Sequence, residues 1–250
     1  RLQRIARHIL DEPNDLAFET LAVVAERSNV QPSAIVRFAQ AFGFAGASPM
    51  QRLIRDGLLQ EDRSLGYAER IRQHRYAAPG EEEGPRELLS EFVKGNILAL
   101  ENLNHSVGMR ELTEAIYLFE KADTVYVAGF SSSFPNASYL TYMLAQADKR
   151  TVMVDGVGGL HLQQARGLRD GDVLVAISYA PYSPETIALV DAFAGRGAVI
   201  AITDSVIGAI AKEHALVLQV RESEVRGFRS LAASMCLAQS LAIGLASRKI

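Results

Sequence analysis

Apolar side chains recur at helical spacing along the first sixty residues, in four short runs. The two central runs lie within residues 20–44 and predict two helices around a tight turn, because Ser28 and Asn29 interrupt the spacing and Asn tolerates a left-handed backbone. Thr20 is placed to cap the first of these helices, and Pro32 suits the first turn of the second. Outer helices are predicted at residues 1–12 and 48–59. Together the runs indicate a compact all-helical module.

The second central helix opens on polar side chains. Its apolar residues, Ile35, Val36 and Phe38, are predicted to face the core of the module, which leaves the other side of the helix exposed. A helix held in this way across a tight turn from a second helix is the arrangement that enters the major groove of DNA. The predicted DNA-contacting positions are Gln31, Ser33, Ala34 and Arg37. The alternative is an ordinary helical core, since paired amphipathic helices are common in soluble proteins.

Charge adds little to the DNA-binding hypothesis. Residues 1–59 hold seven Arg against six Asp or Glu, so the module is nearly neutral and has no strong basic stripe. Affinity is therefore expected to depend on two copies binding DNA together and on salt-sensitive contacts from a few Arg. The whole chain has a formal net charge of -3, which favours solubility and says little about partners.

Composition changes between Gln60 and Arg86. Residues 76–85 are rich in Pro, Gly and Glu, as linkers are. We therefore predict a DNA-binding domain at residues 1–62, a linker at residues 63–85 and a second domain at residues 86–250. Two helices are predicted to open the second domain, at residues 87–103 and 109–121.

The rest of the second domain alternates short apolar runs with helical stretches. The runs are rich in β-branched residues and have the length of buried strands. They lie at residues 124–128, 151–154, 172–177, 198–203 and 216–220. Helices are predicted at residues 135–147, 159–168, 185–195, 206–213 and 229–247. This alternation predicts an α/β fold, with a doubly wound, mostly parallel five-stranded sheet covered by helices on both faces.

Two loops of the predicted sheet carry several hydroxyl groups. Ligands in such sheets bind beyond the carboxyl ends of the strands, where helix N-termini favour anions. The loop at residues 129–133 follows the first strand, and the loop at residues 178–186 follows the third. The predicted effector-binding residues are Ser131, Ser132, Ser133, Ser178, Tyr182, Ser183 and Thr186. Ser and Thr also cap helices where no ligand binds, but two such loops in one sheet favour a binding site.

Other chemistry has weak support in the sequence. The single cysteine excludes an internal disulfide, the five histidines lack metal-ligand spacing, and there is no Walker loop or dinucleotide fingerprint. We therefore expect no metal, no cofactor and no catalytic residue. We interpret Glu185 as an acid in the first turn of a helix, where it interacts favourably with the helix dipole. Cys236 is expected to pack in an apolar helix face. Arg226 and Arg229 are expected to be solvated, although either is placed to reach an anion.

Localisation is predicted from what the sequence lacks. Charged residues interrupt every long apolar segment, so no run approaches the roughly 20 apolar residues of a membrane span. No signal peptide is visible either. A cytoplasmic protein with no membrane association is therefore expected.

The order of the parts resembles the RpiR family of bacterial transcription regulators, which join an N-terminal helix-turn-helix to a C-terminal sugar isomerase (SIS) domain. Val30, residues 34–38 and residues 42–44 are similar to that family's recognition helix and its exit. Gly129–Ser133 and Ser178–Thr186 are similar to the two phosphosugar loops of SIS domains. The resemblance implies a homodimer or homotetramer that binds a palindromic operator in double-stranded DNA and responds to a phosphosugar or a related metabolite.

The chain departs from the family pattern at both sites. The family usually has Gly, Ser and Thr where this chain has Asn29, Gln31 and Ala34, so its base contacts are expected to be its own. The second sugar loop of the family is commonly Ser-x-Ser-Gly-x-Thr, whereas residues 178–186 hold no glycine that lets the backbone approach a phosphate. A bulkier or non-phosphorylated acid is therefore an alternative effector.

These observations predict a ligand-responsive DNA-binding regulator without catalytic activity. Ligand binding is expected to change the packing of two sensor domains, and thereby the spacing of two reading helices, ideally one DNA turn or about 34 Å apart. A sugar-phosphate isomerase with a helical assembly domain is the alternative from another class. A metabolite-binding regulator of another protein is the third hypothesis.

Overall fold

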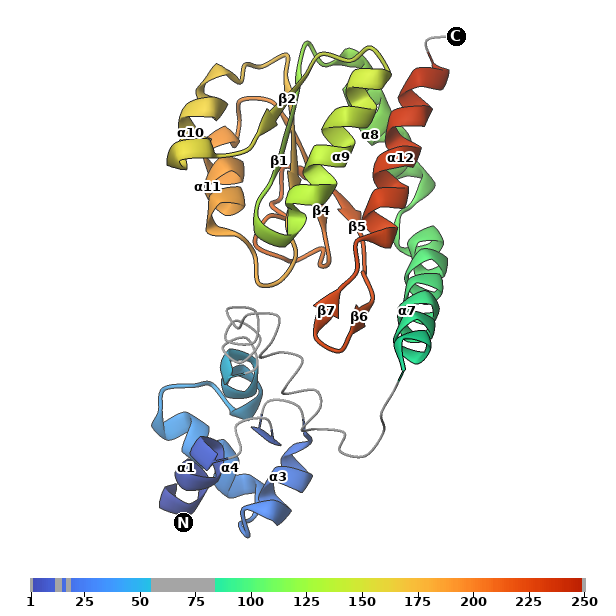
Figure 1. Cartoon of the computed structure of the whole chain (residues 1–250). Coiled ribbons are helices and arrows are strands. Elements are labelled where there is room, and N and C mark those ends of the chain that lie inside the picture. The colour runs from blue at the N-terminus through green and yellow to red at the C-terminus, as the bar shows by residue number, and fades with distance from the viewer. Residues whose placement is uncertain (1, 12–14, 17–18, 55–83, 249–250) are drawn as a thin grey trace. The chain divides into compact units, whose positions relative to one another are not determined.

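The computed structural model describes residues 2–11, 15–16, 19–54 and 84–248. The chain divides into two compact units, Arg1–Pro79 and Gly80–Ile250, each of which is described by itself (Figure 1). The first unit is helical, and the second is built around a parallel sheet.

The first unit contains the predicted pair of helices. Its described helices are α1 (Leu2–Asp11), α3 (Leu21–Arg27), α4 (Pro32–Ala41) and a helical segment at residues 47–54. Thr20 caps α3, its hydroxyl accepting a hydrogen bond from the amide of Val23 at 3.4 Å. Asn29 has a φ of 52°, the left-handed conformation that suits a sharp turn between α3 and α4. The predicted cap and turn are therefore confirmed, and Ile5, Leu16, Val24, Ile35 and Phe38 share the buried core.

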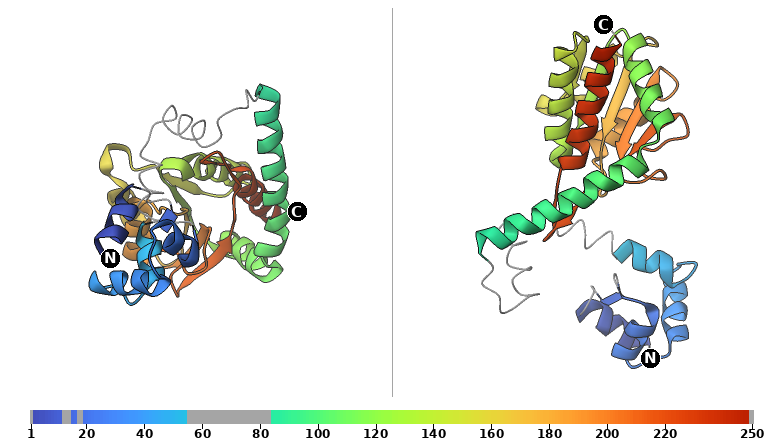
Figure 2. Two further views of the ribbon diagram at one scale, coloured as in Figure 1. Left: turned by 90° about the horizontal axis from the view of Figure 1, so that it is seen from below. Right: turned by 90° about the vertical axis from the view of Figure 1, so that its right-hand side faces the viewer.

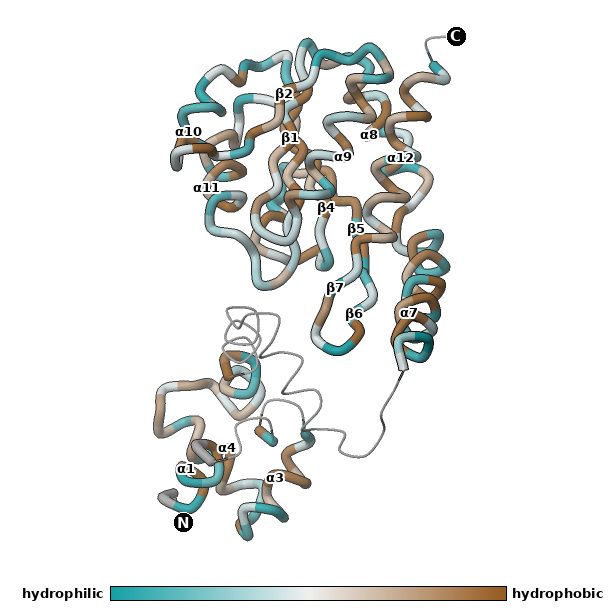
Figure 3. Tube along the Cα trace, in the orientation of Figure 1, coloured by the Kyte–Doolittle hydropathy of each residue, from teal (hydrophilic) through white to brown (hydrophobic). Residues whose placement is uncertain are grey.

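The second unit has a sheet of five parallel strands in the order β2-β1-β3-β4-β5. The strands are β1 (Val125–Gly129), β2 (Thr151–Val154), β3 (Val173–Ile177), β4 (Ala198–Thr203) and β5 (Ala215–Gln219). Two helices precede the sheet, α7 (Pro85–Ser106) and α8 (Met109–Lys121). The predicted α/β fold is confirmed. The strands consist largely of hydrophobic residues, as Figure 3 shows. This composition fits their burial, because β3 and almost all of β4 are buried on both faces.

Helices cover both faces of the sheet. α8, α9 (Phe134–Gln146) and α12 (Ala232–Ser247) pack on one face, where Figure 2 shows α9 and α12 side by side. α11 (Pro184–Phe193) packs on the other face, with α10 (His161–Gln164) against it. β1 therefore leads to one face and its neighbour β3 to the other. In such sheets ligands are expected to bind at the point where the connections that follow two neighbouring strands run to opposite faces.

Two predicted helices differ in the structure. The helix predicted at residues 206–213 is absent: the segment forms turns, and its apolar side chains do not share one face, because Ile210 is buried whereas Ile207 is 91% exposed. The helix predicted at residues 159–168 is reduced to α10 and a 3-10 turn at Ala165–Gly167. Positive φ angles at Gly158 and Gly159 delay its start.

The last helix begins later than predicted, at Ala232, because a β-hairpin precedes it. The hairpin consists of β6 (Glu224–Val225) and β7 (Phe228–Arg229). Arg226 and Gly227 at its tip have φ angles of 53° and 73°, the two positive values that a tight type I′ hairpin turn requires. Cys236 is exposed on α12, so the prediction that it packs in the core is wrong. The buried side of α12 runs through Ala233, Leu237 and Leu241 instead.

Candidate functional site

Three of the four predicted DNA-contacting residues are exposed, Ser33 and Arg37 on α4 and Gln31 just before it. Gln31 immediately precedes the helix, and Arg37 lies one turn after Ser33, donating from Nε to the Ser33 carbonyl at 3.4 Å. Ala34 differs, since it is only 6% exposed and packs in the core of the module. Ala34 and Phe38 are four residues apart and therefore share the inward side of the helix. The prediction that Ala34 faces outward is wrong.

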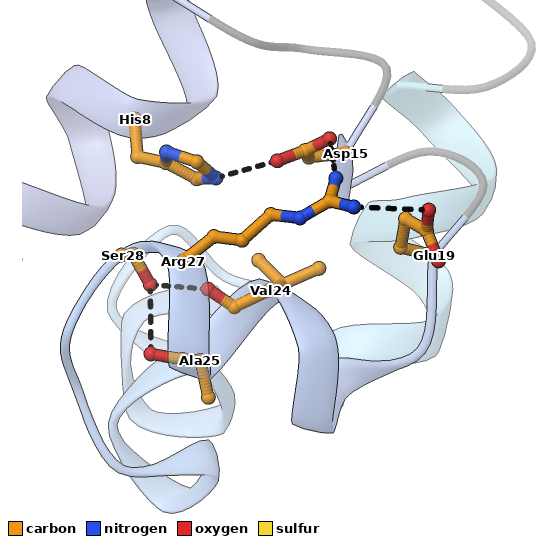
Figure 4. A network of polar contacts seen from close by, with 7 residues as sticks. All are labelled: His8, Asp15, Glu19, Val24, Ala25, Arg27 and Ser28. Atoms are coloured by element: carbon orange, nitrogen blue, oxygen red, sulfur yellow. Dashed lines mark hydrogen bonds and ion pairs between the residues drawn. The ribbon is translucent and has the colours of Figure 1, made fainter.

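A network of polar contacts links α1 to α3 (Figure 4). Asp15 lies 3.1 Å from Nε2 of His8 and 2.5 Å from Nη1 of Arg27. The other terminal nitrogen of Arg27 lies 3.6 Å from the carboxylate of Glu19. Arg27 is therefore engaged with acids of its own module. Arg37, by contrast, is exposed on α4.

The first hydroxyl-rich loop is a tight 3-10 turn at the end of β1. Ser131–Ser133 form the turn, and α9 follows directly. Ser131 and Ser132 are exposed, whereas Ser133 is buried. Gly129 lets the turn approach the strand closely, because a Cβ there would lie 2.9 Å from the carbonyl oxygen of Ser133. Two of the three serines are therefore accessible beyond the strand end.

The second loop contains its own polar network. Ser178 is buried, and its hydroxyl accepts a hydrogen bond from the amide of Ser183 at 3.0 Å. Ser183 caps α11, accepting from the amide of Thr186 at 3.4 Å and donating to the carboxylate of Glu185. The bond from Ser183 and the backbone amide of Glu185 itself lower the pKa of Glu185. Thr186 is fully buried, and its hydroxyl oxygen has no hydrogen-bond partner.

Tyr182 joins the second loop to the end of β4. Its hydroxyl donates to Oδ1 of Asp204 at 2.9 Å, and the amide of Ala180 donates to Oδ2 of the same carboxylate at 3.0 Å. Burial and the bond to Asp204 raise the pKa of Tyr182 to about 12, because both favour the protonated hydroxyl that donates to the carboxylate. Asp204 lies outside the predicted site residues, although an acid directly after a strand of such a sheet is a usable signal.

The hairpin before α12 reaches the same loop. Arg229 donates from Nη2 to the carbonyl of Ala180 at 2.7 Å, and its guanidinium lies 5.3 Å from the centre of the Tyr179 ring. The hydroxyl of Tyr179 is hydrogen-bonded to Ser234 in the first turn of α12. Burial raises the pKa of the Tyr179 phenol. Glu222 accepts a hydrogen bond from the amide of Ser234 at 2.7 Å, so the start of α12 is part of this cluster.

The hairpin also contacts α7. Arg226 and Glu91 form a bidentate ion pair in which both nitrogen–oxygen distances are 2.7 Å, and Ser223 donates to Asn96 at 3.0 Å. Neither Arg226 nor Arg229 is solvated in the way expected from the sequence. The strands of this hairpin have only two residues each, too few for an apolar period, and Gly227 is the only residue of its turn that hairpin rules recognise as a signal.

Within residues 2–11, 15–16, 19–54 and 84–248, no group of three or more His, Cys, Asp or Glu side chains is arranged to hold a metal ion. No helix in that part of the chain is long and apolar enough to cross a lipid bilayer. Two candidate sites follow from the geometry: the exposed polar start of α4, and the polar groups at the carboxyl edge of the sheet.

A sequence model of the SIS domain family matches residues 118–244, which is just over half of the chain and includes both hydroxyl-rich loops and all five strands. A curated relative, the "Bifunctional protein glk" of Burkholderia thailandensis, is 24% identical over 99% of this chain. This chain spans 37% of the length of the curated relatives of that name.

Solved structures share the fold. The sugar isomerase domain of the RpiR transcription factor from Sphaerobacter thermophilus is 23% identical and has a TM-score of 0.60, covering 65% of this chain and 91% of that chain. The NanR protein of Vibrio vulnificus, complexed with ManNAc-6P, is 17% identical and has a TM-score of 0.54, covering 99% of this chain and 84% of that chain. A phosphoheptose isomerase also has this fold. At these identities the likeness is one of fold.

Proposed function

The chain belongs to the SIS domain family, and from this premise we propose that it is a DNA-binding transcription regulator whose operator affinity changes when an anionic metabolite binds its second unit. Residues 1–62 form the proposed DNA-binding domain, residues 63–85 the linker and residues 86–250 the effector domain. The protein acts in the cytoplasm as a homodimer or homotetramer, and two copies of α4 read the two halves of a palindromic operator.

The unpaired hydroxyl of Thr186 is the observation that carries the effector half of the proposal. A buried hydroxyl without a partner is unfavourable, and native proteins rarely keep one without a reason. This hydroxyl lies in the first turn of α11, where the helix dipole favours an anion. The same turn lies at the carboxyl edge of the sheet, where the connections after β1 and β3 run to opposite faces. An effector oxygen at this position pairs with Thr186 and with the neighbouring loop serines.

A sugar phosphate is the effector class with the best support. The NanR structure contains ManNAc-6P and has the fold of this chain over almost its whole length. Ser131 and Ser132 at the first loop, with Ser183 and Thr186 at the second, supply the hydroxyls that a phosphate accepts from. Tyr182 then forms a wall of the site. A non-phosphorylated acid is the alternative, because the second loop has no glycine.

The DNA half of the proposal depends on the exposed start of α4. Gln31 and Ser33 are neutral hydrogen-bonding side chains of the kind that contact base edges and phosphates, and Arg37 supplies a charge on the same exposed side. Ala34, being buried, is no longer a proposed contact. The RpiR protein with this SIS fold is described as a transcription factor, which supports the assignment.

The proposed signal passes from the second loop to α7 through the hairpin. Arg229 holds the loop at Ala180, and Arg226 holds α7 at Glu91. A ligand that shifts the loop therefore acts on the helix that follows the linker to the DNA-binding domain. Such coupling requires the ligand to favour one arrangement of the hairpin over another.

Binding assays on the purified full chain test the proposal. A thermal-shift screen of sugar phosphates and organic acids identifies the effector, and fluorescence anisotropy on a selected DNA duplex measures its effect. Ser132→Ala and Ser183→Ala are expected to abolish the effector response and to spare DNA binding. Ser240→Ala is the matched control, since this exposed serine donates to Cys236 within α12. An intact response in both loop variants excludes the proposed pocket, and a folded chain that selects no duplex excludes the DNA-binding half.

A sugar-phosphate isomerase is the second candidate. Phosphosugar isomerases share the fold, and Glu185 places a carboxylate at the mouth of the second loop. An assay of aldose–ketose interconversion with the compounds found in the screen separates the two functions. Turnover that Glu185→Gln abolishes favours the isomerase, and binding without turnover favours the regulator.

A further inference from the structure

Unpaired polar side chains gather at one edge of the second unit. Among the residues that the structure describes, buried side-chain nitrogen or oxygen atoms without a hydrogen-bond partner occur on His8, Asn136, Thr186 and Arg229. His8 belongs to the first unit, where it lies beside Asp15. The other three come from α9, α11 and the hairpin, and they stand at the carboxyl ends of β1 and β3. Neither Asn136 nor Arg229 is among the effector residues proposed above.

Asn136 occupies in α9 the position that Thr186 occupies in α11. Each is the third residue of its helix, and both are almost fully buried, with exposed fractions of 1% and 0%. Side chains in a helix lean back toward its N-terminus, so both lean toward the loop that precedes their helix. Because α9 and α11 cover opposite faces of the sheet, these two residues lie on the two sides of the neighbouring carboxyl ends of β1 and β3, where ligands of such sheets bind.

The side-chain amide of Asn136 lacks partners on both its nitrogen and its oxygen. An amide offers two donors and an accepting oxygen, and a group placed in a protein interior needs them satisfied. An apolar residue of similar size would avoid the unpaired groups, so the presence of Asn calls for a polar partner. Two neighbouring hydroxyl groups of a ligand match it, because one accepts from the amide nitrogen and the other donates to the amide oxygen.

Arg229 contributes an unpaired charged donor. Its Nη2 donates to the carbonyl of Ala180, but its buried Nη1 has no partner. The nearby acids are engaged elsewhere: Asp204 accepts from Ala180 and Tyr182, and Glu222 accepts from the first amides of α12. A guanidinium donor forms its strongest hydrogen bonds with anionic oxygens.

We infer that Asn136 and Arg229 are effector-binding residues, and that the effector is an anion with neighbouring hydroxyl groups. Asn136 binds the hydroxyl pair, and Arg229 binds the anionic group, whether phosphate or carboxylate, together with Thr186. This inference rests on the effector site of the proposed function. It adds two residues to that site and specifies which part of the ligand each one recognises.

Titrations with three probes test the assignment. The probes are glucose 6-phosphate, gluconate and inorganic phosphate, which are a hydroxylated phosphate, a hydroxylated carboxylate and an anion without a hydroxylated chain. Binding to the full chain is measured by thermal shift for wild type, Asn136→Leu, Arg229→Gln and Thr186→Val. Asn102→Leu, at an exposed asparagine of α7, is the matched control.

The expected pattern differs between the variants. Asn136→Leu weakens both hydroxylated probes about thirtyfold, the loss of two hydrogen bonds, and leaves inorganic phosphate unchanged. Arg229→Gln weakens all three probes, because it removes the charged donor that the anionic group requires. The melting temperature of ligand-free Asn136→Leu equals or exceeds that of wild type, because the unpaired amide is gone. If that variant melts below wild type, Asn136→Ala replaces it in the titrations with the same expectation for the probes.

The possible failures are distinguishable. If wild type binds and Thr186→Val does not, but the Asn136 and Arg229 variants bind like wild type, the two assignments are wrong and the proposed effector site stands. If inorganic phosphate binds as tightly as the hydroxylated probes, the hydroxyl pair has no role and the assignment of Asn136 is wrong. If wild type binds none of the three probes, the inferred ligand class is wrong, and DNA selection by the same chain still tests the proposed regulator.

Discussion

The two candidate sites hold their polar side chains in opposite ways. At the start of α4, Gln31, Ser33 and Arg37 are exposed to solvent. At the carboxyl edge of the sheet, Asn136 and Thr186 are buried with polar atoms that have no partner. Exposed groups keep their water until a partner displaces it, which suits a large charged surface such as DNA. Buried unpaired groups have already lost their water, which suits a small ligand that supplies the missing hydrogen bonds.

This difference gives each site its own mutational signature. Substitutions on the exposed side of α4 change binding and leave the free energy of unfolding almost unaltered. Substitution of a buried unpaired group by an apolar isostere weakens binding while it leaves the ligand-free fold as stable or more stable. Measurements of stability and affinity on the same variants therefore test whether the two sites differ in this way.

Ala34→Lys is expected to have the largest effect. Ala34 lies in the core of the first unit, so a lysine there buries a charge or forces the helices apart, at a cost of about 3 kcal/mol in unfolding free energy. The helical circular-dichroism signal and the melting temperature of the first unit fall, and DNA binding is lost with them. Ser33→Lys, at the exposed neighbour, leaves the melting temperature almost unchanged. A stable Ala34→Lys variant that binds DNA more tightly would show that Ala34 faces DNA after all.

Arg37→Ala is expected to weaken operator binding about tenfold and to lower the slope of log affinity against log salt by about one, as the loss of one phosphate contact does. The melting temperature stays the same because Arg37 is exposed. Anisotropy titrations at several salt concentrations measure both quantities. Arg248→Ala, which removes an ion pair with Glu120 in the second unit, leaves the affinity and the slope unchanged. An unaltered slope in Arg37→Ala shows that another side of the module faces DNA.

The same contrast explains how much could be predicted from the sequence. The strands were predictable because β3 and β4 are buried on both faces and need continuous β-branched runs. The prediction for Ala34 was wrong because a small apolar residue fits either side of a helix. Its position one turn before the buried Phe38 is what places Ala34 on the inward side. The unpaired state of Asn136 depends on which groups the fold brings around it, and the contacts of Arg226 and Arg229 join residues far apart in sequence. Local patterns do not contain this information.

Glu91→Gln tests the path from the effector site to α7 and is expected to have a smaller effect. The variant breaks the bidentate pair with Arg226, whose partly exposed charges contribute little to stability. The ratio of DNA affinities with and without effector falls about threefold, while the affinity for the effector alone is unchanged. Glu120→Gln is a matched control, because it breaks a similarly exposed pair with Arg248. Equal responses in the two variants would remove the hairpin from the signalling path.

Glu185 provides the smallest effect, a change in the pH dependence of stability. Its pKa is lowered, first by the hydrogen bond from Ser183 and then by its own backbone amide. The unfolded chain therefore binds this proton more readily than the folded one, so the stabilisation is complete above the ordinary value of 4.5 and is lost as the pH falls through the lowered folded pKa. Melting temperatures of wild type and Glu185→Gln, followed from neutral pH to about pH 3, should differ by a constant amount until about pH 5 and converge below it. A difference that stays constant down to the lowest pH would mean that folding does not lower the pKa of Glu185, and that its charge does not strengthen the hydrogen bond from Ser183.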